Sequence, residues 1–349
     1  MSFSAHAPPA HGGRSQREQS RPASQQAATG FFHAAERPFM GDTTAHLAAT
    51  RLTDLLTAPG TRPAFGVYQI AGFPDVSASA SVAEMLVRHG GVDFVAIGVP
   101  HLSPVLGSPE MREAHRCALR GGTQMADVMT VVRHLTRHTA APVVVMTYFA
   151  PVVQCGYRRF AAGLADAGAA GAMILDLPLD EAPEWVAAAS DVALHTPQLV
   201  SRRASDLRLR QVSSMSTGWV HVPAANASNN PQQVDVTALR IFCQRLRAYQ
   251  HTPPVVTGVG LCCPEQAAAI SPYVDGIVIG SPLIRPLLEQ SDWRGACAVA
   301  KTTLEFSRAL PRPLPAPREA DALRSDSPAG ATCRRRAEAW NALSPRFSQ

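Results

Sequence analysis

Eight short apolar runs alternate with helical or loop segments between residues 64 and 281, and this alternation constrains the fold more than any other feature. Runs such as VVVM and GIVIG are continuously apolar, as is typical of parallel strands covered on both faces. The expected strands are residues 65–71, 94–98, 142–148, 172–176, 192–195, 219–222, 254–258 and 275–280. This pattern predicts a (β/α)8 TIM barrel, because an open doubly wound sheet usually has fewer strands.

Helical periodicity fills the segments between these strands, whereas both ends of the chain lack it. The expected helices include residues 79–88, 126–137, 157–167 and 236–249, one at 48–56 before the first strand, and one at 293–310 after the last. The ends are rich in Ser, Gln, Ala, Pro, Gly and Arg. Such segments offer too little apolar surface to offset chain entropy, so we expect a barrel over residues 46–310 between disordered tails, 1–45 and 311–349.

Charge and cysteine content argue against several classes of protein. Seven arginines against four acids give residues 311–349 a net charge of +3, out of +5 for the whole chain. No aromatic ladder accompanies the short Arg334–Arg336 run, so we do not expect nucleic-acid binding. Seven cysteines without a CxxC pair or metal-ligand spacing indicate a reduced, cytoplasmic protein. No apolar run is long enough to span a membrane, so we expect neither membrane insertion nor export.

Small residues follow the last two expected strands, where a TIM barrel places its working residues. Gly258 and Gly260 come after the seventh strand, and Gly280-Ser281 come after the eighth. Glycines there let backbone N–H groups approach an anion, and Pro282 suits the first turn of a helix whose positive end would add to the site. We expect phosphate binding here; the alternative is that the glycines only shape turns.

Titratable side chains follow four other expected strands. His101, Asp176, His195 and His221 come after strands two, four, five and six. If they converged on one mouth, they would form an acid–base set or a metal site. The alternative is histidines satisfied by local hydrogen bonds, and we assign no metal and no cofactor. Glu110 is a weaker catalytic candidate, because a carboxylate at a helix start is more often an N-terminal charge.

Residues 93–109, DFVAIGVPHLSPVLGSP, resemble the signature of the tryptophan synthase α-subunit family, usually written ELGVPFSDPLADGP. Three more segments resemble family motifs: GVYQIAGFPD at 66–75, MTYFAPVVQCG at 146–156 and ILDLPLDEA at 174–182. The resemblance covers about residues 47–310 and implies a TIM barrel with a short helix plugging its floor. It also implies retro-aldol cleavage of indole-3-glycerol phosphate to indole and glyceraldehyde 3-phosphate, with the phosphate held by the glycines and serine named above.

Both catalytic carboxylates of that family are replaced in this chain. Ala96 stands at the glutamate position and Gly107 at the aspartate position. Each positioned acid or base contributes roughly 10²–10⁴-fold, so losing both makes the family's reaction improbable. A Schiff-base route is also closed, because the sole lysine, Lys301, falls in the last expected helix, away from the mouth.

Two further departures concern binding. Ser103 replaces an acid that the family uses to dock its β subunit, and Asn229-Asn230 replace a Thr-Gly pair that contacts phosphate. We therefore expect a tryptophan synthase α-chain-like protein without retro-aldol activity. It would bind a phosphorylated, indole-like molecule or a β-type subunit. An active lyase of tryptophan biosynthesis and altered chemistry on a related phosphorylated substrate remain the alternatives.

Overall fold

The structure, a computed structural model, describes residues 42–58, 62–104, 107–225 and 234–311. All of them belong to the larger of the two units into which the chain divides, residues 37–349. Helix α1 (Asp42–Thr57) begins slightly before the expected start of the barrel at residue 46. The rest of the expected N-terminal tail, and the expected C-terminal tail beyond Pro311, lie outside the described residues.

Eight parallel strands form one sheet in the spatial order β4-β3-β2-β1-β8-β7-β6-β5. The strands are β1 Ala64–Ile70, β2 Phe94–Gly98, β3 Val143–Thr147, β4 Gly171–Ile174, β5 Gln198–Leu199, β6 Val220–Val222, β7 Val255–Thr257 and β8 Gly276–Ile279. Backbone hydrogen bonds bridge the remaining seam: His195 N–H donates to the Ala170 carbonyl at 3.0 Å, and Ala172 N–H donates to the His195 carbonyl at 2.9 Å. The TIM barrel predicted from the sequence is confirmed.

The expected fifth strand, residues 192–195, is wrong. Val192 and Ala193 lie in the turn that follows helix α7, and Ala193 has a φ of 57°. The chain reaches the sheet at His195, and β5 is Gln198–Leu199. The apolar run belongs to the segment that leads from α7 back to the sheet. The strand itself was not predicted, because it follows Pro197 and begins with the polar Gln198. His195 therefore begins the fifth strand position instead of ending it.

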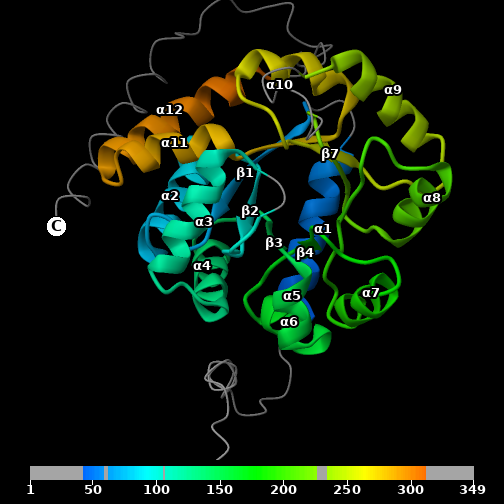
Figure 1. The fold of residues 1–349 in the computed structure, drawn as a ribbon, viewed down its shortest axis with the longest axis horizontal. Helices are drawn as coiled ribbons and strands as arrows, with labels where there is room; N and C mark the ends of the chain where they lie inside the picture. The colour runs from blue at the N-terminus through cyan, green and yellow to red at the C-terminus, as the bar shows by residue number, and fades with distance from the viewer. Residues whose placement is uncertain (1–41, 59–61, 105–106, 226–233, 312–349) are drawn as a thin grey trace, which may run out of the picture. The chain divides into compact units, whose positions relative to one another are not determined.

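Helices follow the strands and cover the outside of the sheet (Figure 1). They are α2 Val76–His89, α3 Pro109–Arg120, α4 Met125–His138, α5 Phe149–Cys155, α6 Tyr157–Asp166, α7 Ala182–Ser190, α8 Asp206–Met215, α9 Val236–Arg247, α10 Pro264–Ile270, α11 Ser281–Glu289 and α12 Trp293–Ala309. Side chains fix several helix starts: Asp75 accepts the Ala78 N–H at 2.8 Å to begin α2, and Ser108 accepts the Met111 N–H at 3.3 Å to begin α3. The expected helices are confirmed within a few residues.

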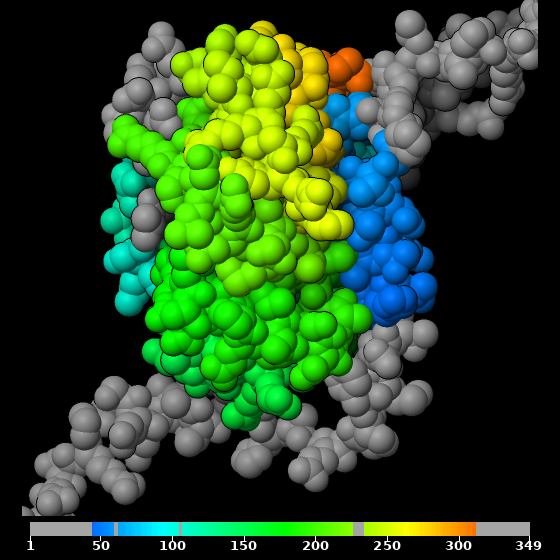
Figure 2. Space-filling view, turned by 90° about the vertical axis from the view of Figure 1, so that its right-hand side faces the viewer, coloured from blue at the N-terminus to red at the C-terminus, as the bar shows by residue number. Residues whose placement is uncertain are grey.

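The barrel interior is apolar, because alternate residues of the strands point inward. These inward residues form one buried cluster with Leu52 and Leu56 of α1: Ala64, Phe94, Ala96, Val144, Met146, Met173, Trp219, Val256 and Val278. Helix α1 thus packs under the N-terminal ends of the strands, as expected for residues 48–56. In Figure 2 its blue residues lie beside green residues from the middle of the chain.

None of the helices within the described ranges is long and apolar enough to cross a membrane.

Candidate functional site at the barrel mouth

The loops that follow the C-terminal ends of the strands form the face of the barrel termed the mouth here. In TIM barrels this face carries the active site. The sequence-predicted residues that lie in these loops or at the start of the helices that follow them are His101, Gly107, Glu110, Asp176, Gly258, Gly260, Gly280 and Ser281.

Ala96 lies on β2 with its side chain in the barrel interior. It has no exposed surface and belongs to the buried cluster with Met146 and Met173. Tyr68 is its partner in the β1–β2 register, and a Cβ placed on Gly98 would collide with the Tyr68 hydroxyl. Burial and the neighbouring Tyr148 raise the pKa of Tyr68 above its usual range. A methyl group at Ala96 cannot transfer a proton, so β2 supplies no acid or base at this level.

Gly107 lies in an exposed loop just before α3. Its φ of 124° belongs to a region that residues with a side chain rarely adopt. A Cβ there would lie 2.8 Å from Cγ of Met111. The Gly107 carbonyl accepts a hydrogen bond from Arg112 at 3.2 Å. This loop conformation therefore depends on glycine, and the residue offers the mouth no side chain.

His101 is held at the mouth by three contacts. Its ring stacks on Tyr148 with ring centroids 4.2 Å apart, and its Nδ1 accepts the Ser103 N–H at 3.2 Å. Its own backbone N–H donates to Nδ1 of His115 on α3 at 3.1 Å. Burial, with His101 nearby, lowers the pKa of His115 to about 4. Because both Nδ1 atoms accept, the neutral form of each ring carries its proton on Nε2.

Asp176 follows β4 and binds the start of α5. Its Oδ1 accepts the backbone N–H of Phe149, the first residue of that helix, at 2.6 Å. A carboxylate at this place stabilises the positive end of the helix. Tyr148 precedes Phe149, so His101 and Asp176 flank the end of β3. Asp176 therefore has a structural task that accounts for its position.

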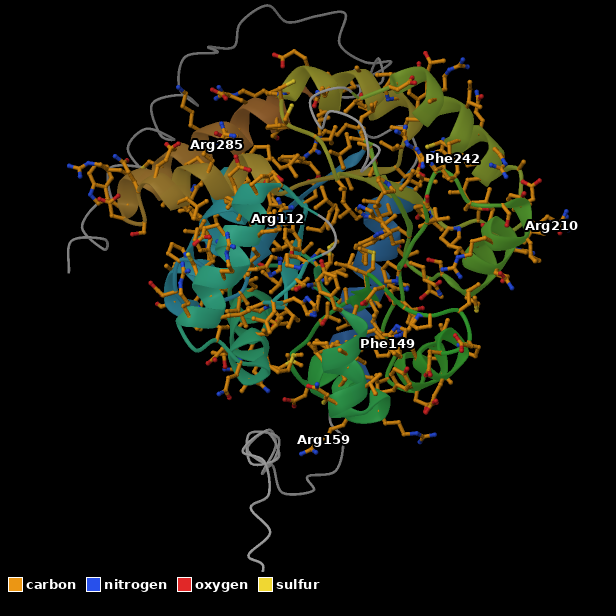
Figure 3. All side chains as sticks on the ribbon, viewed as in Figure 1. Arg112, Phe149, Arg159, Arg210, Phe242 and Arg285 are labelled. Carbon is orange, nitrogen blue, oxygen red and sulfur yellow. The ribbon has the colours of Figure 1, made fainter. Side chains whose placement is uncertain are left out.

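Glu110 lies in the first turn of α3 and pairs with α11. Arg285 of α11, labelled in Figure 3, donates to its Oε1 at 2.8 Å, and the two helices pack together. Hydrogen bonds from Ser108, from the Glu110 backbone and from Arg285 together lower the pKa of this carboxyl. Its position is that of a helix N-terminal charge tied to a neighbouring helix.

The four titratable residues expected at the mouth do not converge. His195 lies at the opposite, N-terminal end of the strands, where its Nε2 is 3.0 Å from both Thr53 Oγ1 and the Ala49 carbonyl of α1. The convergence hypothesis is therefore wrong, because His195 begins the fifth strand position. Its local hydrogen bonds match the alternative interpretation.

His221 lies on β6 and shares the inward face with Trp219. Its side chain is buried, and among the described residues neither ring nitrogen has a hydrogen-bond partner. Burial lowers the pKa of this imidazole to about 4, so the ring is neutral. It is a buried polar group among mostly apolar inward side chains. The His221 ring has no hydrogen-bond partner among the described residues, whereas the His195 ring has two.

The glycines after β7 are pressed against neighbouring backbone. A Cβ on Gly258 would collide with the Val278 carbonyl oxygen, and one on Gly260 would collide with Ala225. Gly260 also has a φ of 96°. The turn is closed by a hydrogen bond from the Leu261 N–H to the Gly258 carbonyl at 3.1 Å. Close packing alone is thus sufficient to require glycine at both positions.

The loop after β8 begins α11. Gly280 is its N-cap, Ser281 its first residue, and Pro282 lies in its first turn. A Cβ on Gly280 would lie 3.1 Å from both Cε of Met111 and Cδ1 of Tyr68. The positive end of this helix therefore lies at the mouth, as an anion site would require. Asn229-Asn230, after β6, lie outside the described residues.

Comparison with known proteins assigns this barrel to a family. The family model described as tryptophan synthase alpha chain matches residues 57–309, which span β1 to α12. The chain belongs to the tryptophan synthase alpha chain family. Tryptophan synthase alpha chains from Streptomyces coelicolor and Streptomyces avermitilis are 35% and 36% identical over 249 residues. The match covers 69% of this chain and 89% and 87% of those proteins.

Solved structures of the family have the same barrel. Tryptophan synthase from M. tuberculosis in an open form matches with a TM-score of 0.67 and 31% identity, covering 74% of this chain and 98% of that chain. A second structure of the M. tuberculosis protein, in space group F222, matches with a TM-score of 0.68 and 30% identity over the same shares. The resemblance of residues 66–182 thus reflects membership of the tryptophan synthase alpha family.

Two residues at this mouth, His115 and Met111, were not predicted from the sequence. His115 and Met111 lie on the buried face of α3, at the spacing of Ala114 and Ala118. That amphipathic spacing could have shown that they face the barrel, but not that Met111 reaches the α11 start or that His115 binds the His101 backbone.

Proposed function

We propose that this chain is a tryptophan synthase alpha family protein that binds without catalysing the family's retro-aldol cleavage of indole-3-glycerol phosphate. The observation that carries the proposal is the surroundings of the two replaced acids. Ala96 is enclosed by apolar side chains, and Gly107 lies in a loop conformation that favours glycine. Both positions therefore lack a carboxylate and are adapted to its absence.

The remaining acids offer no ready substitute. Cleavage needs a proton for the indole ring carbon and a base for the substrate hydroxyl. Asp176 is engaged by the α5 start, and Glu110 by Arg285. The only lysine, Lys301, is exposed on α12, outside the barrel. These positions support loss of both the acid–base route and the Schiff-base route.

A phosphorylated small molecule remains the best candidate ligand. The positive end of α11 at Gly280 and Ser281 lies beside the packed turn of Gly258 and Gly260. A helix start next to close backbone suits a phosphate group. The aromatic rings of Tyr68 and Tyr148 at the same end of the barrel would suit an indole-like body. The proposed ligand is therefore a phosphorylated, indole-like molecule.

A β-type subunit is the proposed protein partner. The structural relatives are described as tryptophan synthase. Two apolar side chains on mouth elements, Leu102 and Val153 of α5, are exposed by 80% and 50% and would be available to a partner. Ser103 replaces the docking acid of the family, so we expect weaker association. The described cysteines are free thiols, in keeping with the proposed cytoplasmic location.

An indole-release assay with indole-3-glycerol phosphate, alone and with a β subunit, tests the proposal. We expect no indole from the natural protein. The Ala96→Glu/Gly107→Asp variant is compared with Ala96→Gln/Gly107→Asn, which has similar volume and no carboxylate. Activity in the first variant alone would mean that substrate still binds. Indole release by the natural protein at ordinary rates would overturn the proposal.

Altered chemistry on a related phosphorylated substrate is the second candidate function. It is favoured by His221, whose buried ring nitrogens have no described partner. A neutral imidazole at this buried position could accept a proton from a molecule bound beside it. Product analysis by NMR, with His221→Phe as the matched variant, tests this. A new product that requires His221 would favour altered chemistry over binding alone.

A further inference from the structure

A cluster of metal-ligand residues lies on the outside of the barrel, away from the mouth. It consists of Glu84 on α2 and His134 and His138 on α4, termed the α2–α4 triad here. One ligand atom from each lies within 4.8 Å of the others, and within the described residues no other group of three such side chains is this close. Helices of the barrel run opposite to its strands, so the last turns of α4 lie at the floor side.

The two histidines face the same way because they are four residues apart on one helix. Their rings stack with centroids 4.3 Å apart. Nε2 of His134 is 2.7 Å from Oε2 of Glu84, so the triad spans the contact between α2 and α4, which lie side by side in Figure 1. Histidine nitrogen and carboxylate oxygen are common zinc ligands.

Hydrogen bonds already orient two of the three ligands. Nδ1 of His138 donates to the His134 carbonyl at 2.7 Å, which leaves Nε2 of His138 with a free lone pair. Arg88 donates to Oε1 of Glu84 at 2.7 Å, which leaves Oε2 for the histidines. Metal-binding histidines and carboxylates typically make a second hydrogen bond of this kind, to a backbone carbonyl or a charged side chain.

The local charge also suits a cation. The negative end of α4 lies at His134 and His138. Among the described residues, the opposing charge in direct contact with the triad is Arg88, which also donates to the His138 carbonyl at 2.7 Å.

We propose that the α2–α4 triad binds a zinc ion that ties α2 to α4. Zn²⁺ takes lone pairs from Oε2 of Glu84 and Nε2 of His134 and His138, and water fills the fourth position. On binding, the Nε2 proton of His134 that now bridges to Glu84 is exchanged through solvent for a proton on Nδ1 of the same ring, so the bound form is the Nδ1–H tautomer with its Nε2 lone pair on the ion. Since the triad is remote from the mouth, the ion stabilises the barrel wall and takes no part in ligand binding there.

The sequence alone indicates two of the three ligands. The H-x-x-x-H spacing of residues 134–138 places two ligands on one helical face, but the third lies 50 residues earlier. Only the packing of α2 against α4 brings Glu84 to the histidines.

Titration of the full-length, metal-free protein with ZnCl₂ by calorimetry tests the proposal. His138→Ala and Glu84→Gln are the test variants, because one is exposed and the other keeps the side-chain shape. His251→Ala, an exposed histidine outside the triad, is the matched control. We expect each test variant to bind zinc at least about tenfold more weakly at one site, and the control to match the natural protein.

Thermal unfolding gives a second readout. Saturating zinc should raise the unfolding midpoint by about 5 °C in the natural protein and in His251→Ala, and by much less in the test variants. Visible absorption of bound Co²⁺ should disappear in the same two variants. Cysteines and tail histidines offer other metal ligands, so equal zinc binding in His138→Ala and the natural protein would overturn the proposal. So would a midpoint that zinc leaves unchanged in the natural protein.

Discussion

Tyr68 and Ala96 are register partners across β1 and β2, and the tyrosine hydroxyl lies against β2 at Gly98. Both side chains belong to the inward face, one as a large ring and the other as a single methyl group. The family resemblance places a glutamate at residue 96, so a carboxylate there would have to fit beside this ring and the two buried methionines, Met146 and Met173. The surroundings of Ala96 are therefore apolar and offer a charge no partner among the residues of that cluster.

Ala96→Glu should therefore lower stability in a pH-dependent way. Burial raises the pKa of the new carboxyl above its unfolded value of about 4.3, so the folded state keeps a proton that the unfolded state loses. Stability should then fall as pH rises from about 4 toward the raised pKa, with a slope of about 1.4 kcal/mol per pH unit. Urea unfolding at pH 4 and pH 7 measures this. Ala96→Gln is the control, and equal pH dependence in both variants would contradict the argument.

Gly107→Asp should destabilise the protein through the backbone rather than through charge. The φ of 124° disfavours any Cβ, and that atom would also meet Met111. We expect a loss of about 1–3 kcal/mol. Gly107→Ala is the control, because it adds the Cβ without the carboxylate and should lose a similar amount. A stable Gly107→Asp variant beside an unstable Gly107→Ala variant would show that the loop accommodates the family's acid.

Ser281→Asp should separate phosphate binding from the stability of α11. A carboxylate at the first residue of this helix favours the helix, by about 0.3–1 kcal/mol, yet repels a phosphate at the same place. We expect at least about tenfold weaker binding of glycerol 3-phosphate by calorimetry, with an unchanged or slightly raised unfolding midpoint. Ser281→Asn, which has similar shape without charge, is the control. Unchanged phosphate affinity in Ser281→Asp would exclude this site.

The fold was predictable because buried parallel strands leave an apolar signature that does not depend on their neighbours. The runs at β3 and β8 are of this kind, and both were predicted within two residues. The strand prediction at residues 192–195 was wrong because the turn before the strand is as apolar in sequence as a strand. Sequence periodicity reports burial, and burial alone does not distinguish a strand from the turn before it.

The candidate site was less predictable, because its contacts join residues that are distant in sequence. That Asp176 and His101 lie at the mouth followed from strand order, but the stacking of His101 on Tyr148 depends on loop conformation. The position of His195 was wrong for a related reason. The sequence placed it at the end of the fifth strand, at the mouth, whereas in the structure it precedes β5 and lies at the floor. The sequence showed that Ala96 and Gly107 stand where the family resemblance implies acids, whereas the apolar surroundings of Ala96 and the positive φ of Gly107 required the structure.

His221→Phe should reduce the acid sensitivity of the protein. Burial holds the folded pKa of His221 at about 4, below its unfolded value of about 6.5, so only the unfolded state takes up a proton between these values. Stability is therefore lost as pH falls from about 6.5 to 4, and this residue accounts for about 3 kcal/mol of that loss. Phenylalanine has similar volume and no titrating group, so the variant should lose less stability over this range. Urea unfolding at pH 7 and pH 4.5 measures the difference.

His115→Phe is a useful comparison, because burial also lowers the pKa of His115 to about 4. Unlike His221, His115 accepts a hydrogen bond through Nδ1 from the His101 N–H. Of the two variants, only His115→Phe should therefore lose stability at pH 7. An unchanged pH dependence in His221→Phe would mean that His221 has a hydrogen-bond partner in solution and titrates normally.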